Sequence, residues 1–182
     1  MNYQITHISE CERLFGRQND LSQRQQLTLW AEKLIIRQSG LPLQVAKDLK
    51  GKPFFKNNPL LHCSVSHTSY FIATALASTP IGIDIEHLRC DKQEISQRFF
   101  TSEENEYLSK LPKEEFDTSF TRLWTLKEAY SKCIGIGISG SFSSQTIDLA
   151  ALNVKGREQD FVLVSEYDTS RQLFIAICLR KG

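Results

Sequence analysis

Apolar residues recur at helical spacing in two stretches of the chain. The first stretch has the i, i+3, i+4, i+7 and i+8 pattern of a helix with one buried face, at Leu27, Trp30, Ala31, Leu34 and Ile35. Gly40 and Pro42 predict its end. The second stretch runs from about Lys113 to Cys133, and Gly135 supplies the expected C-terminal stop. We therefore expect one helix near the N-terminus and a longer one in the second half.

Short apolar runs with β-branched residues predict strands at 61–66, 71–77, 81–86, 161–164 and 173–179. Short turns separate the first three, which predicts an antiparallel meander. The last two flank the polar turn Tyr167 to Ser170 and predict a hairpin. Thr101 and Glu104 match a capping box, so a further helix is expected to begin there.

The order of these elements, helix then sheet and helices then sheet, predicts an α+β fold. We expect two similar α/β lobes in one compact unit, residues 1–90 and 91–182, each a small antiparallel sheet packed with helices. A chain of 182 residues is long enough to bury a core without disulfides.

Composition narrows the range of partners. The 22 Lys and Arg residues against 21 Asp and Glu give a net charge of +1, which provides no overall field for nucleic acid or an anionic membrane. The five cysteines form no Cys-x-x-Cys pair, and no apolar run is long enough to span a bilayer. We expect a cytoplasmic protein without a disulfide framework, and any anion site must be local.

Two carboxylates share one face of the predicted strand 81–86. Strand alternation puts Ile81, Ile83 and Ile85 on one side and Asp84 and Glu86 on the other. Two ionised acids there repel unless a cation neutralises them, and Mg²⁺ prefers such oxygen ligands. Taken alone, the pair favours the simpler interpretation, in which both acids lie on the solvent face of an edge strand.

The long helix carries a second charged pair. Glu128 and Lys132 lie four residues apart on one face, and Trp124 lies one turn before Glu128. A solvated ion pair beside a core tryptophan explains this pattern. Alternatively, Glu128 completes a metal site with Asp84 and Glu86, and Lys132 reaches a phosphate.

Two further segments could contact an anion. Ser66 and His67 end the predicted strand 61–66, where side chains can hold a phosphate. No Gly-x-Ser-x-Gly elbow or base-orienter pair accompanies Ser66, so a nucleophilic serine is not indicated. Lys52, between Gly51 and Pro53, is presented on a turn that could also be an ordinary surface turn.

Taken together these motifs resemble the 4'-phosphopantetheinyl transferase superfamily, and within it the surfactin-synthetase-activating (Sfp) type. The likeness covers roughly residues 50 to 138. In chain order it rests on Gly51-Lys52-Pro53, Cys63 to Thr68, Gly82 to Glu86, Arg98-Phe99-Phe100 with Glu103-Glu104, Trp124 to Lys132, and Gly135-x-Gly137.

The resemblance implies an enzyme that moves the 4'-phosphopantetheine group of coenzyme A to a serine of an apo acyl or peptidyl carrier protein, releasing 3',5'-ADP. It implies a monomer of two pseudo-symmetric lobes with coenzyme A between them. It implies Mg²⁺ on Asp84, Glu86 and Glu128, with Glu128 also the candidate general base. It further implies coenzyme A contacts from Arg13, Arg24, Lys52, Ser66, His67 and Lys132.

Two other functions remain open from the sequence. The three acids would also suit a Mg²⁺-dependent phosphohydrolase or nuclease, although the position two after Glu86 is Leu88 and not the lysine of one nuclease motif. A non-catalytic coenzyme A-binding protein is the other possibility. It would be favoured by a damaged acid triad, whereas all three acids are present.

Overall fold

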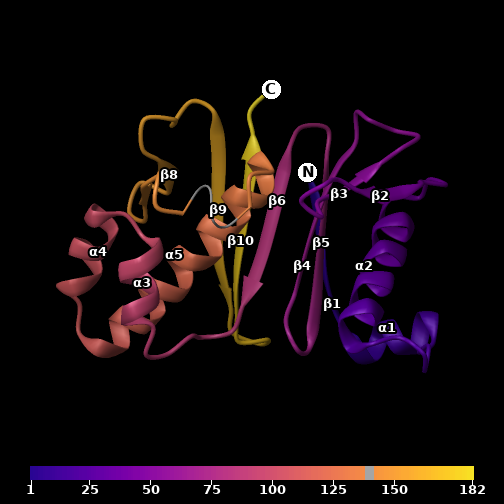
Figure 1. Cartoon of the computed structure of the whole chain (residues 1–182), viewed down its shortest axis with the longest axis horizontal. Coiled ribbons are helices and arrows are strands. Elements are labelled where there is room, and N and C mark those ends of the chain that lie inside the picture. The colour runs from indigo at the N-terminus through magenta and orange to yellow at the C-terminus, as the bar shows by residue number, and fades with distance from the viewer. Residues whose placement is uncertain (138–141) are drawn as a thin grey trace.

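The computed structural model describes residues 1–137 and 142–182 (Figure 1). The helices of this part are α1 (Ile8–Phe15), α2 (Gln23–Ser39), α3 (Gln93–Phe99), α4 (Ser102–Ser109) and α5 (Lys113–Ile134). The strands are β1 (Asn2–His7), β2 (Val45–Lys47), β3 (Pro53–Phe55), β4 (His62–His67), β5 (Phe71–Ala77), β6 (Ile81–Glu86), β7 (Ile147–Asp148), β8 (Asn153–Val154), β9 (Phe161–Asp168) and β10 (Leu173–Arg180).

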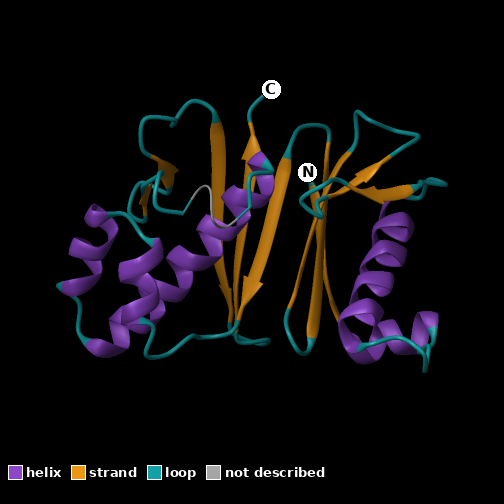
Figure 2. Cartoon of the chain, in the orientation of Figure 1, coloured by secondary structure: helices purple, strands orange, loops and turns teal. Residues whose placement is uncertain are grey.

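Two antiparallel sheets lie at the centre of the described molecule. The first sheet has the order β1-β5-β4 and the second sheet has the order β6-β10-β9. Figure 2 shows α1 and α2 outside the first sheet and α3, α4 and α5 outside the second. This is the predicted α+β architecture with small antiparallel sheets.

The predicted meander is wrong in its third strand. β4 pairs with β5, but β6 pairs along its length with β10. At the edge of β6 that faces β4, the Ile83 N–H donates to the Ser64 hydroxyl at 3.0 Å. The acceptor is therefore a serine side chain of β4 and not a backbone carbonyl of a paired strand. Ser66 of β4 likewise contacts β6 through its side chain, by donating to Asp84. The division of the chain at residue 90 stays a prediction; β6, which precedes it, belongs to the second sheet.

The alternation predicted for β6 is confirmed. Ile81, Ile83 and Ile85 are buried in a cluster with side chains of β5 and β10, among them Ala73, Ala75, Ala77, Leu173, Ile175 and Ile177. The small alanines of β5 allow the two sheets to approach closely. The alternate positions of β6, which begin at Gly82, therefore face α5.

The helices begin and end close to their predicted bounds. α2 and α5 match the two periodic stretches, and each ends at a glycine in the left-handed region, Gly40 and Gly135. Thr101 and Glu104 form the capping box of α4. β9 and β10 form the predicted hairpin, with β9 extending to Asp168. None of the described helices has the length and apolar character needed to cross a membrane.

Candidate active site

Asp84 links both halves of the fold. Its side chain is buried, and its Oδ1 accepts hydrogen bonds from Ser66 Oγ at 2.6 Å and from Lys132 Nζ at 2.7 Å. Ser66 comes from β4, Asp84 from β6 and Lys132 from α5. Asp84 Oδ2 is buried without a hydrogen-bond partner. The interpretation of Asp84 as part of a solvated strand face is therefore wrong.

Lys132 does not pair with Glu128 as an ordinary helical i,i+4 ion pair would. Its ammonium group lies on Asp84 and also donates to the Ile83 carbonyl at 3.2 Å. The Lys132 side chain is 28% exposed and that of Asp84 is 5% exposed, so the pair lies between solvent and core. A lysine held in this position can reach an anion that enters from the solvent side.

Glu86 and Glu128 lie in the electrostatic field of Asp84. Burial and then the Asp84 carboxylate raise the pKa of Glu128 to about 7, and the same two causes raise the pKa of Glu86. Lys132 and Arg89 act in the opposite direction on both groups. Asp84 therefore lies close enough to both glutamates to disfavour their ionisation, and the two basic residues offset part of this effect.

The chemistry of this donor set fits Mg²⁺. Carboxylate oxygens are the ligands that Mg²⁺ prefers, and the unpartnered Asp84 Oδ2 is the kind of buried atom that requires a cation or donor. As the side chains stand, no three His, Cys, Asp or Glu groups among the described residues lie close enough to share a metal ion. The assignment of Asp84, Glu86 and Glu128 as ligands stays a prediction.

A cavity of about 600 Å³, called the cleft here, lies beside these residues. From the first half it is lined by Arg24 of α2, by the 50–53 turn and by β4. From the second half it is lined by Glu128 and Lys132 of α5 and by Phe99. It therefore lies between the two halves of the chain, where a ligand would touch both.

The other residues predicted to contact coenzyme A differ in their position relative to the cleft. His67 ends β4 with an exposed side chain, and its pKa is lowered by partial desolvation and then by the positive charges of Lys132 and Arg24. Arg13 is exposed on α1, 3.9 Å from Glu10, and does not line the cleft. Lys52 lines the cleft, but its ammonium group donates to backbone carbonyls of α5.

Gly82 brings β6 and α5 together, a role that the sequence analysis missed. A Cβ atom at Gly82 would lie 1.9 Å from the carbonyl oxygen of Ala129 and 2.6 Å from the backbone nitrogen of Cys133. Only a glycine fits this approach. A glycine inside an isoleucine-rich strand is the signal that could have predicted it.

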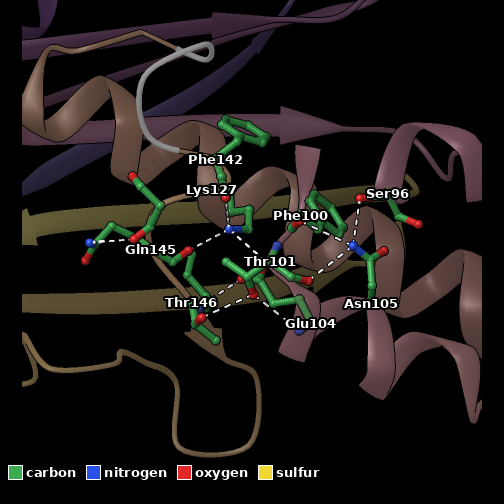
Figure 3. Close-up of polar contacts among 11 residues, drawn as sticks. Ser96, Phe100, Thr101, Glu104, Asn105, Lys127, Phe142, Gln145 and Thr146 are labelled. Atoms are coloured by element: carbon green, nitrogen blue, oxygen red, sulfur yellow. Dashed lines mark hydrogen bonds and ion pairs between the residues drawn. The ribbon is translucent and has the colours of Figure 1, made fainter. Parts of the chain in front are cut away.

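A buried ion pair connects α5 to α4 (Figure 3). Lys127 and Glu104 are each 2% exposed in their side chains, and Lys127 Nζ lies 2.8 Å from Glu104 Oε2. Lys127 also donates to the carbonyls of Phe142 and Gln145, and Glu104 Oε1 accepts the N–H of Ile147. The pair thus joins α4, α5 and the 142–147 segment. The buried pair could have been predicted from the sequence, because Lys127 lies on the apolar face of a predicted helix.

Replacing Lys127 by methionine is expected to lower the free energy of unfolding by about 3 to 5 kcal/mol, because Glu104 would stay buried without its partner. Chemical denaturation measures this. Lys110→Met, which removes the exposed partner of Glu106, is the control and should leave stability almost unchanged. Equal stability of the two variants would contradict a structural role for the buried pair.

Comparisons with known proteins agree with one family. The model of the 4'-phosphopantetheinyl transferase superfamily matches residues 80–178, over half of the chain. The chain is 35% identical over 136 residues to the 4'-phosphopantetheinyl transferase psf-1 of Bacillus pumilus, covering 72% of this chain and 58% of that protein. It is 33% identical over 135 residues to a 4'-phosphopantetheinyl transferase of Bacillus subtilis, covering 70% and 59%.

A solved structure is also similar. The holo-[acyl-carrier-protein] synthase of Thermotoga maritima matches with a TM-score of 0.46 at 16% identity, over 57% of this chain and 64% of that one. The chain spans a little under three fifths of the length of the two curated relatives described above.

Proposed function

Because the chain belongs to the 4'-phosphopantetheinyl transferase superfamily, we propose that it transfers the 4'-phosphopantetheine group of coenzyme A to a serine of an apo carrier protein, with Mg²⁺. The contact among Ser66, Asp84 and Lys132 supports this most directly. These residues come from three elements and lie beside the cleft, where a pyrophosphate could meet both cationic and acidic groups.

The proposed enzyme acts as a monomer in the cytoplasm, with two pseudo-symmetric lobes and coenzyme A between them. The five cysteines are free, as a reducing compartment would keep them. The cleft, which has a wall from each side of the fold, supports a binding site for coenzyme A between the lobes.

Positive groups bind the pyrophosphate of coenzyme A in this proposal. Lys132 and His67 donate to its oxygens, and Arg24 at the cleft extends the positive field toward the nucleotide. When the bond between the two phosphates breaks, negative charge accumulates on the leaving 3',5'-ADP. Donors already aimed at that charge lower the barrier. Ser66 holds Asp84 in place through its hydroxyl.

The carrier serine needs a base because its hydroxyl is a weak nucleophile at neutral pH. Glu128, which lines the cleft, is proposed to take the hydroxyl proton as the serine oxygen bonds to the phosphorus of the phosphopantetheine group. Asp84, Glu86 and Glu128 would hold Mg²⁺, which supplies charge neutralisation for the pyrophosphate when bound.

One experiment tests the proposal against its alternatives. The protein is incubated with coenzyme A, Mg²⁺ and a panel of apo carrier proteins, and the carrier mass is measured. We expect the carrier to gain one phosphopantetheine group, and EDTA to prevent this gain. Loss of coenzyme A without carrier modification would instead indicate a phosphohydrolase. Binding without either reaction would indicate a non-catalytic coenzyme A-binding protein.

Lys132→Ala is expected to lower kcat/KM for coenzyme A by about a hundredfold, because a charge-assisted contact to the departing phosphate is lost. Steady-state transfer kinetics measure this. Lys110→Ala, which breaks only an exposed pair with Glu106, is the matched control and should retain full activity. Unchanged kinetics in Lys132→Ala would leave this lysine with a structural role alone.

A further inference from the structure

Lys52 makes contacts across the fold that differ from those of a free phosphate-binding lysine. Its Nζ donates to the carbonyl oxygen of Lys132 at 2.5 Å and to that of Cys133 at 3.0 Å. Both carbonyls belong to the last turn of α5. Lys52 itself lies in the turn between β2 and β3, far from α5 in sequence.

The end of α5 needs such a partner. The last carbonyls of a helix have no N–H of the same helix to accept from, and the helix dipole favours a positive charge beside them. Gly135 N donates to the Ser131 carbonyl, which leaves the following carbonyls for other donors. The Lys52 stem passes close to Gly135: a Cβ atom there would lie 3.8 Å from Lys52 Cδ, at ordinary contact distance.

The turn that carries Lys52 is itself held in shape. Asp48 Oδ1 accepts the backbone N–H groups of Lys50 and Lys52, both at 2.9 Å, and Asp48 N donates to the Lys52 carbonyl at 3.0 Å. Gly51 supplies the left-handed conformation that the turn requires, with φ of 83°. The ammonium group therefore extends from a fixed base in the first half of the chain.

We propose that Lys52 is a positioning residue, which ties the 48–52 turn to the last turn of α5 and so fixes Lys132 against Asp84. The inference rests on the proposed function and refines it, because it assigns to Lys52 a role other than phosphate binding. Both hydrogen bonds of the Lys52 ammonium group go to backbone carbonyls of α5, so this lysine connects the 48–52 turn to the helix that carries Lys132. Losing this tie should shift Lys132 and slow transfer, while coenzyme A still binds.

Lys52→Met tests the proposal, because methionine matches the lysine side chain as far as Cε and removes the ammonium donors. We expect faster hydrogen exchange in the 128–137 segment, and kcat lower by about tenfold to a hundredfold, as a small displacement of reacting groups produces. We expect the Kd for coenzyme A, measured by calorimetry, to change by less than about twofold, because Lys52 itself contacts no phosphate and Lys132 acts mainly on the charge that develops as the phosphate leaves. Lys56→Met, at an exposed lysine outside the cleft, is the matched control.

A Kd raised by about tenfold with unchanged exchange would overturn the proposal and make Lys52 a phosphate contact. If Lys52→Met does not fold, Lys52→Gln is measured, because its amide keeps a donor without the charge. Positioning then predicts a Kd close to that of the wild type, and a phosphate contact predicts a weaker one. Exchange and binding need no carrier, so a wild-type protein that transfers nothing would refute the proposed function and leave this test intact.

Discussion

Replacing Asp84 by asparagine is expected to lower the transfer rate by about a thousandfold or more. The substitution removes the negative charge that pairs with Lys132 and that would bind Mg²⁺. The amide keeps the size of the side chain and an oxygen that can accept from Ser66. Transfer to an apo carrier at saturating coenzyme A, over a series of Mg²⁺ concentrations, measures the effect.

Asp20→Asn is the matched control, because Asp20 is exposed and far along the chain from β6. It should match the wild type in rate and in Mg²⁺ dependence. Asp84→Asn should keep its far-ultraviolet circular dichroism, which separates lost chemistry from lost structure. A rate within about tenfold of the wild type would show that Asp84 is dispensable and would remove it from the proposed ligand set.

Glu128→Gln is expected to give a comparable loss for a different reason. It removes a proposed ligand and also the proposed base for the carrier serine. The affinity for coenzyme A, measured by calorimetry without carrier, should fall less than the transfer rate, because the base acts only on the serine of the carrier.

The elements that the sequence predicted correctly have local signals. The apolar period of α2 and α5, the glycines at their ends and the capping box of α4 each depend on a few neighbouring residues. The alternation in β6 gave the faces of Asp84 and Glu86 for the same reason. The pairing of β6 was not predictable, because its partner β10 lies about ninety residues away in the chain.

For the candidate site, the sequence predicted which residues share a face of one strand or helix, but not which side chains contact one another. Sequence alone placed Glu128 and Lys132 on one helix face, yet it could not show that Lys132 would turn to Asp84 and Lys52 to the carbonyls of α5. Those contacts depend on how closely β6 and α5 approach. That distance is set by Gly82, where the strand passes against the helix backbone.

Gly82→Ala is therefore expected to destabilise the protein by about 3 kcal/mol or more, because the new methyl group would overlap backbone atoms that no side-chain rotation can move away. β6 or α5 must shift as a whole. Asp84 follows Gly82 by two residues and Lys132 precedes Cys133, so the same shift should separate the pair and lower transfer as well. Urea denaturation and transfer kinetics on one preparation measure both effects.

Two further variants test whether the effect comes from the close contact between the backbones of β6 and α5. Gly182→Ala adds the same methyl group at ordinary contact distance from Thr79 and should leave stability and activity unchanged. Adding Ala129→Gly to Gly82→Ala should not restore stability, because the nearest overlap is with the Ala129 carbonyl oxygen and not with its side chain. Restoration by Ala129→Gly, or a single variant as stable as the wild type, would mean that β6 and α5 separate at little cost. The position of Asp84 beside Lys132 would then need another cause.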